Sequence, residues 1–314
     1  MNIGLDMMGG DFAPLEAVKS IQPYLSETAS PANLFLIGDE KQVSPLLLQY
    51  APGVQAELVH APDVIGMHEH PTRALKEKQQ SSIATGFRLL AAGTIDSFIS
   101  AGNTGAMLVG THYSIKSLPG VLRPTIATMM PKDNGEAGIL LDVGLNADCK
   151  PEQLNQFALL GSLYSRYILG TQNPRVGLVN IGEEEGKGNL LAQAAFPLLK
   201  ANNRINFIGN IEGRDILLDK ADVMVCDGFT GNVVLKLAES FYDITRQKGI
   251  QHEFLERFNF ENYGGTPVLG VSKPVIIGHG ISHAKAFRNM IKLAHKMLET
   301  SLIDRMKEQF LSAE

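Results

Sequence analysis

Short apolar runs that alternate with helical patterns constrain the fold of this chain more than any other feature. Each run is rich in β-branched residues and is followed by a glycine-containing turn and then a helical pattern. The expected strands are residues 1–6, 33–37, 97–100, 138–143, 175–179, 223–226 and 275–277. Because parallel strands need crossover connections, strands that alternate with helices indicate βαβ units on a mostly parallel sheet. The sequence therefore predicts an α/β fold.

Apolar residues at helical spacing predict the connecting helices. We expect them at residues 14–25, 81–92, 151–169, 190–200 and about 282–311. Pro151 suits the first position of a helix, where its missing N–H would have no partner. Charged residues interleaved with phenylalanines at about 235–262 predict an amphipathic helical excursion from the sheet. No linker is visible, so residues 1–314 are expected to form a single catalytic α/β domain.

Composition excludes several classes of protein. With 314 residues, of which 44% are hydrophobic and 19% charged, the chain can bury a large core. A net charge of −5 argues against a nucleic-acid partner. No cationic leader is visible and no apolar run reaches the roughly 18 residues of a membrane span, so a cytoplasmic protein is expected. The two cysteines have no CxxC pattern, which argues against a disulfide framework or a zinc site.

Five glycine-containing turns fall at the expected strand ends. They are residues 6–11, 100–105, 142–146, 182–189 and 227–232. In open α/β sheets, ligands bind outside the carboxyl ends of the strands, where backbone N–H groups at helix N-termini can face an anion. One such glycine is more often only a tight-turn residue, but five at strand ends favour an anion site.

The turn at residues 182–189 is not a nucleotide phosphate-binding loop. It has one residue too few between its glycines, and Gly188 stands where Ser or Thr should hold magnesium. No GxGxxG motif follows any expected strand, so a dinucleotide site has little support. Lys187, at the start of a helix, could still hold one phosphate dianion or polarise a carbonyl. A solvated loop lysine is the alternative.

Five motifs together resemble the phosphate acyltransferase (PlsX) family of bacterial phospholipid synthesis. The motifs are DMMGGD (6–11), ISAGNTGA (99–106), LDVG (141–144), DGFTGN (227–232) and NYGG (262–265). The resemblance implies a three-layer α/β/α sandwich related to isopropylmalate dehydrogenases and phosphotransacetylases. It also implies a homodimer that converts acyl carrier protein thioesters and inorganic phosphate to acyl phosphates, with no cofactor and no metal.

The resemblance also assigns candidate site residues. The proposed catalytic pair of the family, a lysine in a glycine-rich loop and an asparagine in the DGFTGN loop, falls on Lys187 and Asn232. The glycine-containing turns and the loop before the terminal helix supply the candidates for binding substrate and phosphate, which are Asp6, Gly9, Gly10, Gly102, Asn103, Thr104, Gly105, Asp142, Asn146, Asp227, Thr230, Gly231 and His279. One stretch departs from the family pattern: between Gly231 and Tyr263 the chain is shorter than expected. In the family this stretch is associated with dimer packing and membrane contact, so at most weak peripheral contact at the inner face of the membrane is expected.

Attack of phosphate on a thioester requires a held phosphate, charge neutralisation and a stabilised oxyanion, with no metal or redox cofactor. We expect Lys187 to neutralise the phosphate or the oxyanion and Asn232 to donate a hydrogen bond to the same centre. Backbone N–H groups near residues 102–105 are expected to hold the remaining oxygens. This hypothesis requires Lys187, Asn232 and the Gly102 turn to converge.

Cysteine and histidine offer other interpretations. Cys226 could carry an acyl group, but it continues an apolar strand with no neighbouring base, which favours a structural role. The His68-Glu69-His70 fragment lacks the helical spacing of a metal site and is interpreted as a solvated turn. His279 precedes Gly280 and is expected in a loop at a helix start, as a site candidate.

On the terminal helix, Lys285, Arg288 and Lys292 stand three and four residues apart and share one face. They are candidates for docking an acidic carrier protein, and a solvated surface is the alternative. Two other functions remain open: a phosphotransacetylase-like enzyme that uses acyl-coenzyme A, and a non-catalytic scaffold that binds carrier proteins.

Overall fold

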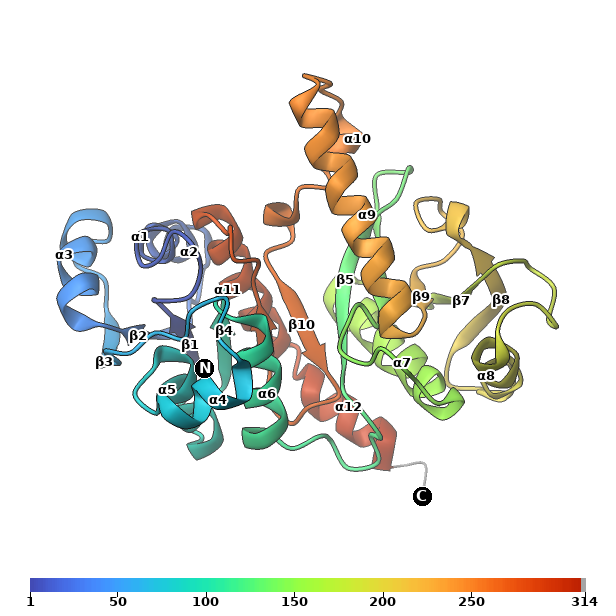
Figure 1. The fold of residues 1–314 in the computed structure, drawn as a ribbon, viewed down its shortest axis with the longest axis horizontal. Coiled ribbons are helices and arrows are strands. Elements are labelled where there is room, and N and C mark those ends of the chain that lie inside the picture. The colour runs from blue at the N-terminus through green and yellow to red at the C-terminus, as the bar shows by residue number, and fades with distance from the viewer. Residues whose placement is uncertain (312–314) are drawn as a thin grey trace. The chain divides into compact units, whose positions relative to one another are not determined.

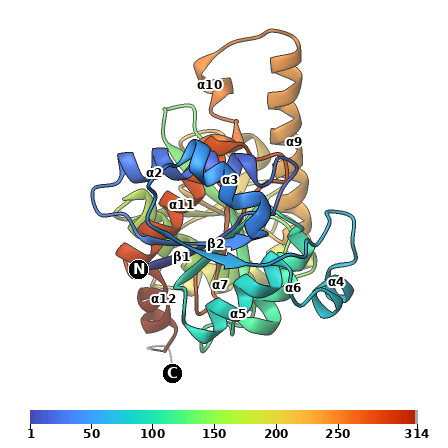
Figure 2. The same ribbon diagram turned by 90° about the vertical axis from the view of Figure 1, so that its left-hand side faces the viewer.

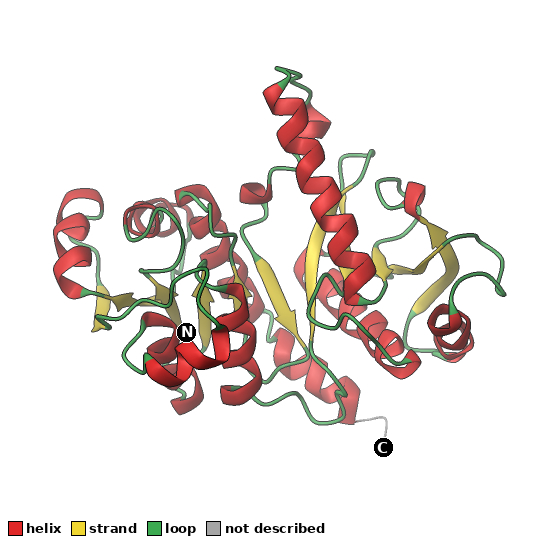
Figure 3. Ribbon diagram, viewed as in Figure 1, coloured by secondary structure: helices red, strands yellow, loops and turns green. Residues whose placement is uncertain are grey.

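The computed structural model describes residues 1–311, which form two compact units. Unit 1 comprises Met1–Ser117 and Phe260–Ile303, and unit 2 comprises Leu118–Asn259 together with residues 304–311. Each unit has its own mostly parallel strands and its own covering helices (Figure 3). The predicted α/β class is confirmed. A single catalytic domain over residues 1–314 stays a prediction.

The sheet of unit 1 follows the order β3-β2-β1-β4-β11-β10. Its strands are β1 (Asn2–Asp6), β2 (Asn33–Gly38), β3 (Ala56–His60), β4 (Ser97–Ser100), β10 (Thr266–Leu269) and β11 (Val275–Ile277). All neighbours are parallel except β10 and β11, which are antiparallel. Because β1, β4 and β11 run in the same direction, the turns after Asp6, Ser100 and Ile277 lie at one edge of this sheet.

Helices cover both faces of the unit 1 sheet. They are α1 (Leu15–Lys19), α2 (Ile21–Glu27), α3 (Glu40–Tyr50), α4 (Pro71–Glu77), α5 (Ser82–Ala92), α6 (Thr104–Ser114) and α11 (Ala284–Glu299), with a short 3₁₀ turn, η3 (Phe260–Asn262). Figure 2 shows α2, α3 and α11 on one side of β1 and β2, and α4, α5 and α6 on the other. This arrangement gives unit 1 the three layers that the sequence predicts.

Two aromatic rings show why helices α5 and α6 pack closely on the sheet. Phe98 on β4 and Phe87 on α5 are both buried and meet edge to face with ring centroids 5.2 Å apart. A Cβ atom at Gly86 would lie 2.2 Å from the Phe98 ring, and one at Gly110 would lie 2.2 Å from the Phe87 ring. Glycine therefore permits these contacts, since any larger residue would push the helices away.

The sheet of unit 2 follows the order β5-β6-β9-β7-β8. Its strands are β5 (Thr125–Pro131), β6 (Ala137–Leu141), β7 (Arg175–Asn180), β8 (Asn206–Glu212) and β9 (Val223–Val225). β5 and β6 form an antiparallel hairpin, and the remaining neighbours are parallel. The turns after Leu141, Asn180 and Val225 therefore share one edge, because β6, β7 and β9 run in the same direction.

The helices of unit 2 follow these strands. They are α7 (Pro151–Tyr164) with its π-helical continuation η1 (Ser165–Leu169), α8 (Leu190–Ala201), the 3₁₀ turn η2 (Gly213–Asp215), α9 (Gly228–Gln247), α10 (Glu253–Glu256) and α12 (Leu302–Leu311), whose first two residues fall in unit 1. Figure 1 shows the far end of α9 and the short α10 projecting beyond the strands of unit 2.

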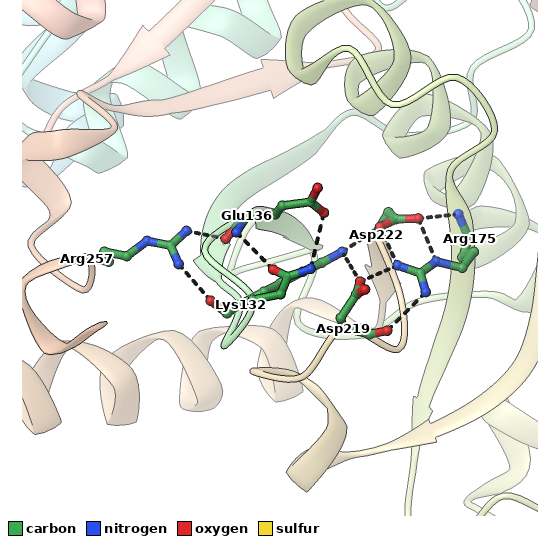
Figure 4. A network of polar contacts seen from close by, with 7 residues as sticks. Lys132, Glu136, Arg175, Asp219, Asp222 and Arg257 are labelled. Atoms are coloured by element: carbon green, nitrogen blue, oxygen red, sulfur yellow. Dashed lines mark hydrogen bonds and ion pairs between the residues drawn. The ribbon is translucent and has the colours of Figure 1, made fainter. Parts of the chain in front are cut away.

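An ionic cluster around the buried Lys132 and Asp222 lies at the other edge of unit 2 (Figure 4). The Lys132 side chain is 1% exposed, and its Nζ lies 2.5 Å from Asp222 Oδ1 and 3.1 Å from Asp219 Oδ1. Burial favours a higher pKa for Asp222, but hydrogen bonds from Arg175 and Lys132 outweigh it and hold this pKa well below its usual range. Arg257 donates to the Lys132 carbonyl at 2.7 Å, which fastens the segment after α10 to the β5–β6 hairpin.

Three predicted helix boundaries are wrong. The terminal helix expected at about 282–311 is two helices, separated at Ser301, whose φ is 50°. The helix expected at 14–25 is also two, since Pro23 lacks the N–H that would continue a helix from α1. The excursion expected at about 235–262 begins earlier, within the 20-residue α9, because Asp227 caps a helix that starts at Gly228.

Candidate active site

Asp6 ends β1 and organises the turn that follows. Its side chain is fully buried; Oδ1 accepts a hydrogen bond from Met8 N at 2.9 Å and Oδ2 accepts one from Ser100 Oγ at 2.6 Å. Burial raises the pKa of Asp6, and hydrogen bonds from Ser100 and Ser82 oppose the shift. Since both oxygens are engaged by the protein, we interpret Asp6 as a residue that shapes the turn.

The turns after β1 and β4 touch at Gly9 and Gly102. Gly102 N donates to Ser100 Oγ at 2.9 Å, so one hydroxyl links Asp6 to the second turn. A Cβ atom at Gly9 would lie 2.6 Å from Gly102 N. Only glycine permits this close approach of the two backbones.

Asn103 fastens the start of α6 to a neighbouring loop. The side chain is 4% exposed, and its Oδ1 accepts the cap hydrogen bond from Ala106 N at 2.9 Å. Its Nδ2 donates to the carbonyl oxygens of Gly66 (2.9 Å), Met67 (3.2 Å) and Glu69 (3.1 Å). Thr104 is exposed at the first position of α6, and a Cβ atom at Gly105 would lie 2.8 Å from Pro71 Cγ. Asn103 is therefore a positioning residue. The exposed residue of this turn is Thr104, at the start of α6.

The turn after β1 also packs against the loop that carries His279. Gly10 has a φ of 102°, and a Cβ atom there would lie 3.0 Å from the Gly280 oxygen. Asp11 N donates to the same oxygen at 2.8 Å. Unit 1 thus gathers three loops, those after β1, β4 and β11, at one edge of its sheet.

In unit 2, Asp142 repeats the role of Asp6. It follows β6, is fully buried, and accepts from Ile126 N and Leu145 N at Oδ1, both at 3.2 Å. Its Oδ2 accepts from Asn146 N at 2.6 Å and from Asn146 Nδ2 at 2.8 Å. Burial raises the pKa of Asp142, and the hydrogen bonds from Asn146 oppose the shift. The carboxylate shapes the turn at residues 143–146.

The start of α9 packs directly on that turn. Asp227 caps the helix by accepting from Thr230 N at 2.8 Å and Thr230 Oγ1 at 3.0 Å. Gly228 N donates to the Asn146 oxygen at 2.7 Å. A Cβ atom at Gly231 would lie 1.9 Å from the Asp142 oxygen, so only glycine fits at this position.

Asn232 lies in the first turn of α9 with an exposed side chain. Its Nδ2 donates to the Val143 oxygen at 3.1 Å. Gly144 has a φ of 132°, and a Cβ atom there would lie 3.0 Å from that Nδ2. The amide is thus oriented by the Asp142 turn, while its second N–H has no hydrogen-bond partner within residues 1–311 and is available to a ligand.

Lys187 lies in the exposed loop between β7 and α8. Of the three glutamates before it, Glu183 pairs with Lys220 at 2.6 Å and Glu185 pairs with Lys200 at 2.5 Å. The Lys187 oxygen accepts from Asn180 Nδ2 at 3.0 Å, which fixes the backbone. Within the described chain, the Lys187 ammonium has no hydrogen bond or ion pair, so its charge is available to an anion.

The structure brings the predicted residues together in two groups. Unit 1 gathers Asp6, Gly9, Gly10, Gly102, Asn103 and His279, and unit 2 gathers Asp142, Asn146, Asp227, Thr230, Gly231 and Asn232. Lys187 lies in unit 2 as well, on the turn after the next parallel strand. Convergence of Lys187, Asn232 and the Gly102 turn stays a prediction, as does contact of each candidate with phosphate.

The basic face proposed for carrier-protein docking is partly neutralised. Arg288 lies 3.0 Å from Glu27, Lys292 also pairs with Glu27, and Lys285 donates to Asn262. Three cations and one carboxylate leave this group a net charge of +2, since 3 − 1 = 2. The group is weaker than the sequence alone suggested, and docking stays a prediction.

Cys226 and the His68-Glu69-His70 fragment gain no support as reactive sites. Cys226 is 3% exposed, and burial raises the pKa of its thiol well above the usual value. Glu69 Oε1 is engaged by Lys78 Nζ at 2.5 Å and Gly66 N at 2.7 Å. Within residues 1–311 no group of three or more His, Cys, Asp or Glu side chains could hold a metal ion.

Two residues that the sequence reasoning did not single out position the candidate site. Ser100 bridges Asp6 to Gly102 N, and Asn180 fixes the backbone of Lys187. Each is the last residue of a parallel strand, directly before a glycine-containing turn. A polar residue at the end of a strand, before a glycine-containing turn, is the sequence signal that could have identified Ser100 and Asn180.

None of the helices in residues 1–311 combines the length and the apolar character that a membrane span requires.

Known proteins resemble the chain over nearly its whole length. A family model described as "Fatty acid synthesis protein" matches residues 1–305. A protein of Aquifex aeolicus named phosphate acyltransferase is 42% identical, over 96% of this chain and 94% of its own. One of Chlorobaculum tepidum with the same name is 43% identical, over 95% of this chain and 98% of its own. These identities far exceed what a shared fold alone requires.

Solved structures with a similar fold are more distant in sequence. A phosphotransacetylase from Streptococcus pyogenes has a TM-score of 0.68 at 16% identity, covering 95% of this chain and 94% of its own. A branched-chain phosphotransacylase from Enterococcus faecalis has a TM-score of 0.65 at 13% identity, covering 95% of this chain and 99% of its own. At these identities the likeness concerns the fold.

Proposed function

The chain belongs to the phosphate acyltransferase family, and we propose that it transfers a long-chain fatty acyl group from the thioester of acyl carrier protein to inorganic phosphate. The observation that carries the proposal is the match, over 95% or more of the chain, to relatives named phosphate acyltransferase. The family model adds fatty acid synthesis as the metabolic context. The acyl phosphate product would serve phospholipid synthesis.

In the proposed reaction, a phosphate oxygen attacks the thioester carbon, a C–O bond forms and the C–S bond breaks. The electron pair of the broken bond leaves with sulfur, and the proton lost by hydrogen phosphate ends on the thiol. Negative charge on the carbonyl oxygen grows in the transition state, and donors fixed in advance stabilise it most.

Two exposed side chains of unit 2 are suited to these tasks. The unpaired Lys187 ammonium would neutralise the phosphate or the oxyanion, and Asn232 would donate its free N–H to the same centre. Asp142 supports Asn232 indirectly, because it shapes the turn whose Val143 oxygen orients the amide. In unit 1, backbone N–H groups at the start of α6 would hold phosphate oxygens.

Product trapping tests the proposal. The enzyme is incubated with palmitoyl carrier protein, with and without inorganic phosphate, and acyl phosphate is trapped with hydroxylamine as the hydroxamate. We expect hydroxamate to form only with both enzyme and phosphate. Consumption of the thioester at the same rate without phosphate would contradict the proposal.

A phosphotransacetylase-like activity on acyl-coenzyme A is the second candidate, and the fold likeness to the phosphotransacetylase of Streptococcus pyogenes favours it. Both reactions use the same phosphate chemistry, so the acyl donor distinguishes them. The primary proposal expects a higher kcat/KM for palmitoyl carrier protein than for acetyl-coenzyme A. The reverse order would favour the second candidate.

For α9 we propose that an exposed apolar stripe is covered in a homodimer. The stripe consists of Phe229, Val233, Leu237, Phe241 and Ile244, all between 54% and 68% exposed. Positions three and four apart share one face of a helix, so these side chains form one continuous strip. Light scattering should give twice the monomer mass for the wild type and less for Leu237→Glu. A monomeric wild type that floats with anionic vesicles would instead favour peripheral membrane contact.

A further inference from the structure

The loop that carries His279 is fixed on both sides. Gly278 N donates to the Ser100 oxygen at 2.8 Å, and the Gly280 oxygen accepts from Asp11 N at 2.8 Å. Ser282 donates to the His279 oxygen from its N at 3.0 Å and from its Oγ at 2.5 Å. His279 therefore stands between one residue that contacts the turn after β4 and another that contacts the turn after β1.

The two ring nitrogens of His279 lie in different surroundings. The ring packs on Phe260 with centroids 5.0 Å apart, which fixes its orientation. Nδ1 is buried and has no hydrogen-bond partner within residues 1–311. By contrast, the buried His295 ring pairs its Nδ1 with Tyr24 Oη at 3.0 Å. Nε2 of His279 also lacks a protein partner but is not among the buried unpaired atoms, and the residue is half-exposed.

This asymmetry selects a tautomer. A neutral imidazole carries one proton, on Nδ1 or on Nε2. Buried N–H groups without an acceptor are rarer in proteins than buried acceptors without a donor. The neutral ring therefore keeps its proton on Nε2, which presents a donor at the accessible side of the ring.

We propose that His279 is a further phosphate-binding residue, whose Nε2–H donates a hydrogen bond to an oxygen of the inorganic phosphate. The inference rests on the proposed function for the identity of the ligand. Three features support it: Nε2 is not among the buried unpaired atoms, its loop contacts both glycine turns of unit 1, and Phe260 packs on the ring. A donor fixed in advance binds an anion without first losing rotamer freedom. His279 touches the phosphate in this scheme and acts as a hydrogen-bond donor, with Nδ1 serving only to fix the tautomer.

A pair of amide substitutions tests the atom as well as the residue. The amide nitrogen of glutamine can take the place of Nε2, and that of asparagine can take the place of Nδ1. Binding of inorganic phosphate to wild type, His279→Gln and His279→Asn is measured by ³¹P NMR titration without acyl donor. Loss of a hydrogen bond to a charged ligand weakens binding by about tenfold or more. We expect that loss for His279→Asn and a dissociation constant within about threefold of wild type for His279→Gln.

The outcomes separate this inference from the proposed function. Equal phosphate binding by all three proteins, or no phosphate binding by the wild type, would overturn the role of His279. Equal losses in both variants, with unchanged melting temperatures, would overturn the assignment to Nε2. If the wild type and His279→Gln bind phosphate alike while no acyl hydroxamate forms, the inference stands and the proposed function fails.

Discussion

The two units build similar turns from buried carboxylates, but they leave different groups exposed. Asp6 ends a buried strand in unit 1 and Asp142 follows one in unit 2, and burial raises the pKa of each. In unit 1 the Asn103 side chain is engaged by the protein, and the groups that remain are the backbone amides at the start of α6 and the half-exposed His279 ring. In unit 2, Lys187 and Asn232 are exposed, and within residues 1–311 the Lys187 ammonium and one N–H of the Asn232 amide have no hydrogen-bond partner.

This difference separates residues that shape a turn from residues that can act on a substrate. A fully buried carboxylate whose oxygens accept hydrogen bonds from the protein is not accessible to a ligand, and its negative charge would oppose a phosphate. The chemistry should therefore depend on the exposed donors of unit 2. The carboxylates should matter mainly for stability.

The largest effects are expected at the exposed donors of unit 2. Loss of one donor to an oxyanion typically lowers turnover by about 10² to 10³. We expect a loss of about 100-fold or more in kcat for Lys187→Ala and for Asn232→Ala, measured by hydroxamate formation. Lys200→Ala is a matched control, since this exposed lysine pairs with Glu185 of the same loop, and it should stay within about threefold of wild type. A variant that keeps activity within about tenfold would remove its residue from the scheme.

Stability should distinguish the two carboxylates. Both Asp142 oxygens accept hydrogen bonds from N–H groups. In Asp142→Asn the new amide N–H groups would face these donors, so we expect the free energy of unfolding to fall by about 2 kcal/mol. In Asp6→Asn, the amide can donate to Ser100 Oγ in place of the present bond, so a loss of about 1 kcal/mol or less is expected. Urea unfolding of both variants at pH 7 measures the difference. A larger loss of unfolding free energy for Asp6→Asn than for Asp142→Asn would contradict this difference between the two carboxylates.

The pH dependence of the free energy of unfolding, compared between wild type and Asp6→Asn, provides a second test. A carboxyl whose pKa is raised in the folded state binds more protons there than when unfolded. Its contribution to stability is fully present below its unfolded pKa of about 3.9 and is lost as the pH rises through the raised folded value. Replacing Asp6 by Asn removes this contribution. Between pH 4 and pH 7 the free energy of unfolding of Asp6→Asn, relative to wild type, should therefore rise. A constant difference would show that the Asp6 pKa is not raised.

A smaller effect is expected at Asn103. Removal of a helix cap costs about 1 kcal/mol, and Asn103→Ala also releases the loop at residues 66–69. We expect a loss in kcat/KM of about tenfold, because the start of α6 would lose its fixed position. Ser81→Ala is the control: it removes the cap of α5, where Ser81 Oγ accepts from Ala84 N at 3.3 Å. It should lower stability by a similar amount without changing activity, and equal losses of activity would refute the positioning role.

The smallest effect is expected at Arg288. Because Glu27 already pairs with Arg288 and Lys292, reversing one charge should raise the Michaelis constant for acyl carrier protein by only about threefold, and less for acyl-coenzyme A. Lys307→Glu, an exposed charge reversal on helix α12, serves as the control. Equal effects on both acyl donors would contradict docking at this face.

The sequence predicts part of the framework of both units, but the expected strands do not include β3, β5, β8 and β10. Strand 275–277 lies where an apolar run placed it, because a strand buried on both faces favours a continuous apolar run. The break at Ser301 carried no glycine or proline to reveal it. There the Thr300 hydroxyl donates to the Lys296 oxygen at 2.7 Å, a bond that competes with helix continuation.

The sequence predicted which turns form the candidate site, but not the role of each residue in them. Glycine at strand ends indicated which turns matter, since a close approach of two backbones requires it. The role of Asn103 was hidden, because its Nδ2 contacts carbonyl oxygens that stand 34 to 37 positions away in the sequence. Burial of Asp6 likewise depends on neighbouring strands rather than on adjacent residues.

The central claim is that phosphate attacks the thioester directly, with no acyl group held on Cys226. An exchange assay tests it: the enzyme is mixed with palmitoyl carrier protein and radiolabelled free carrier protein in the absence of phosphate. Direct attack predicts no transfer of label into the thioester, with exchange appearing once phosphate is added, and it predicts the same behaviour for Cys226→Ser. Exchange without phosphate at a rate close to turnover would demonstrate an acyl-enzyme and contradict the account.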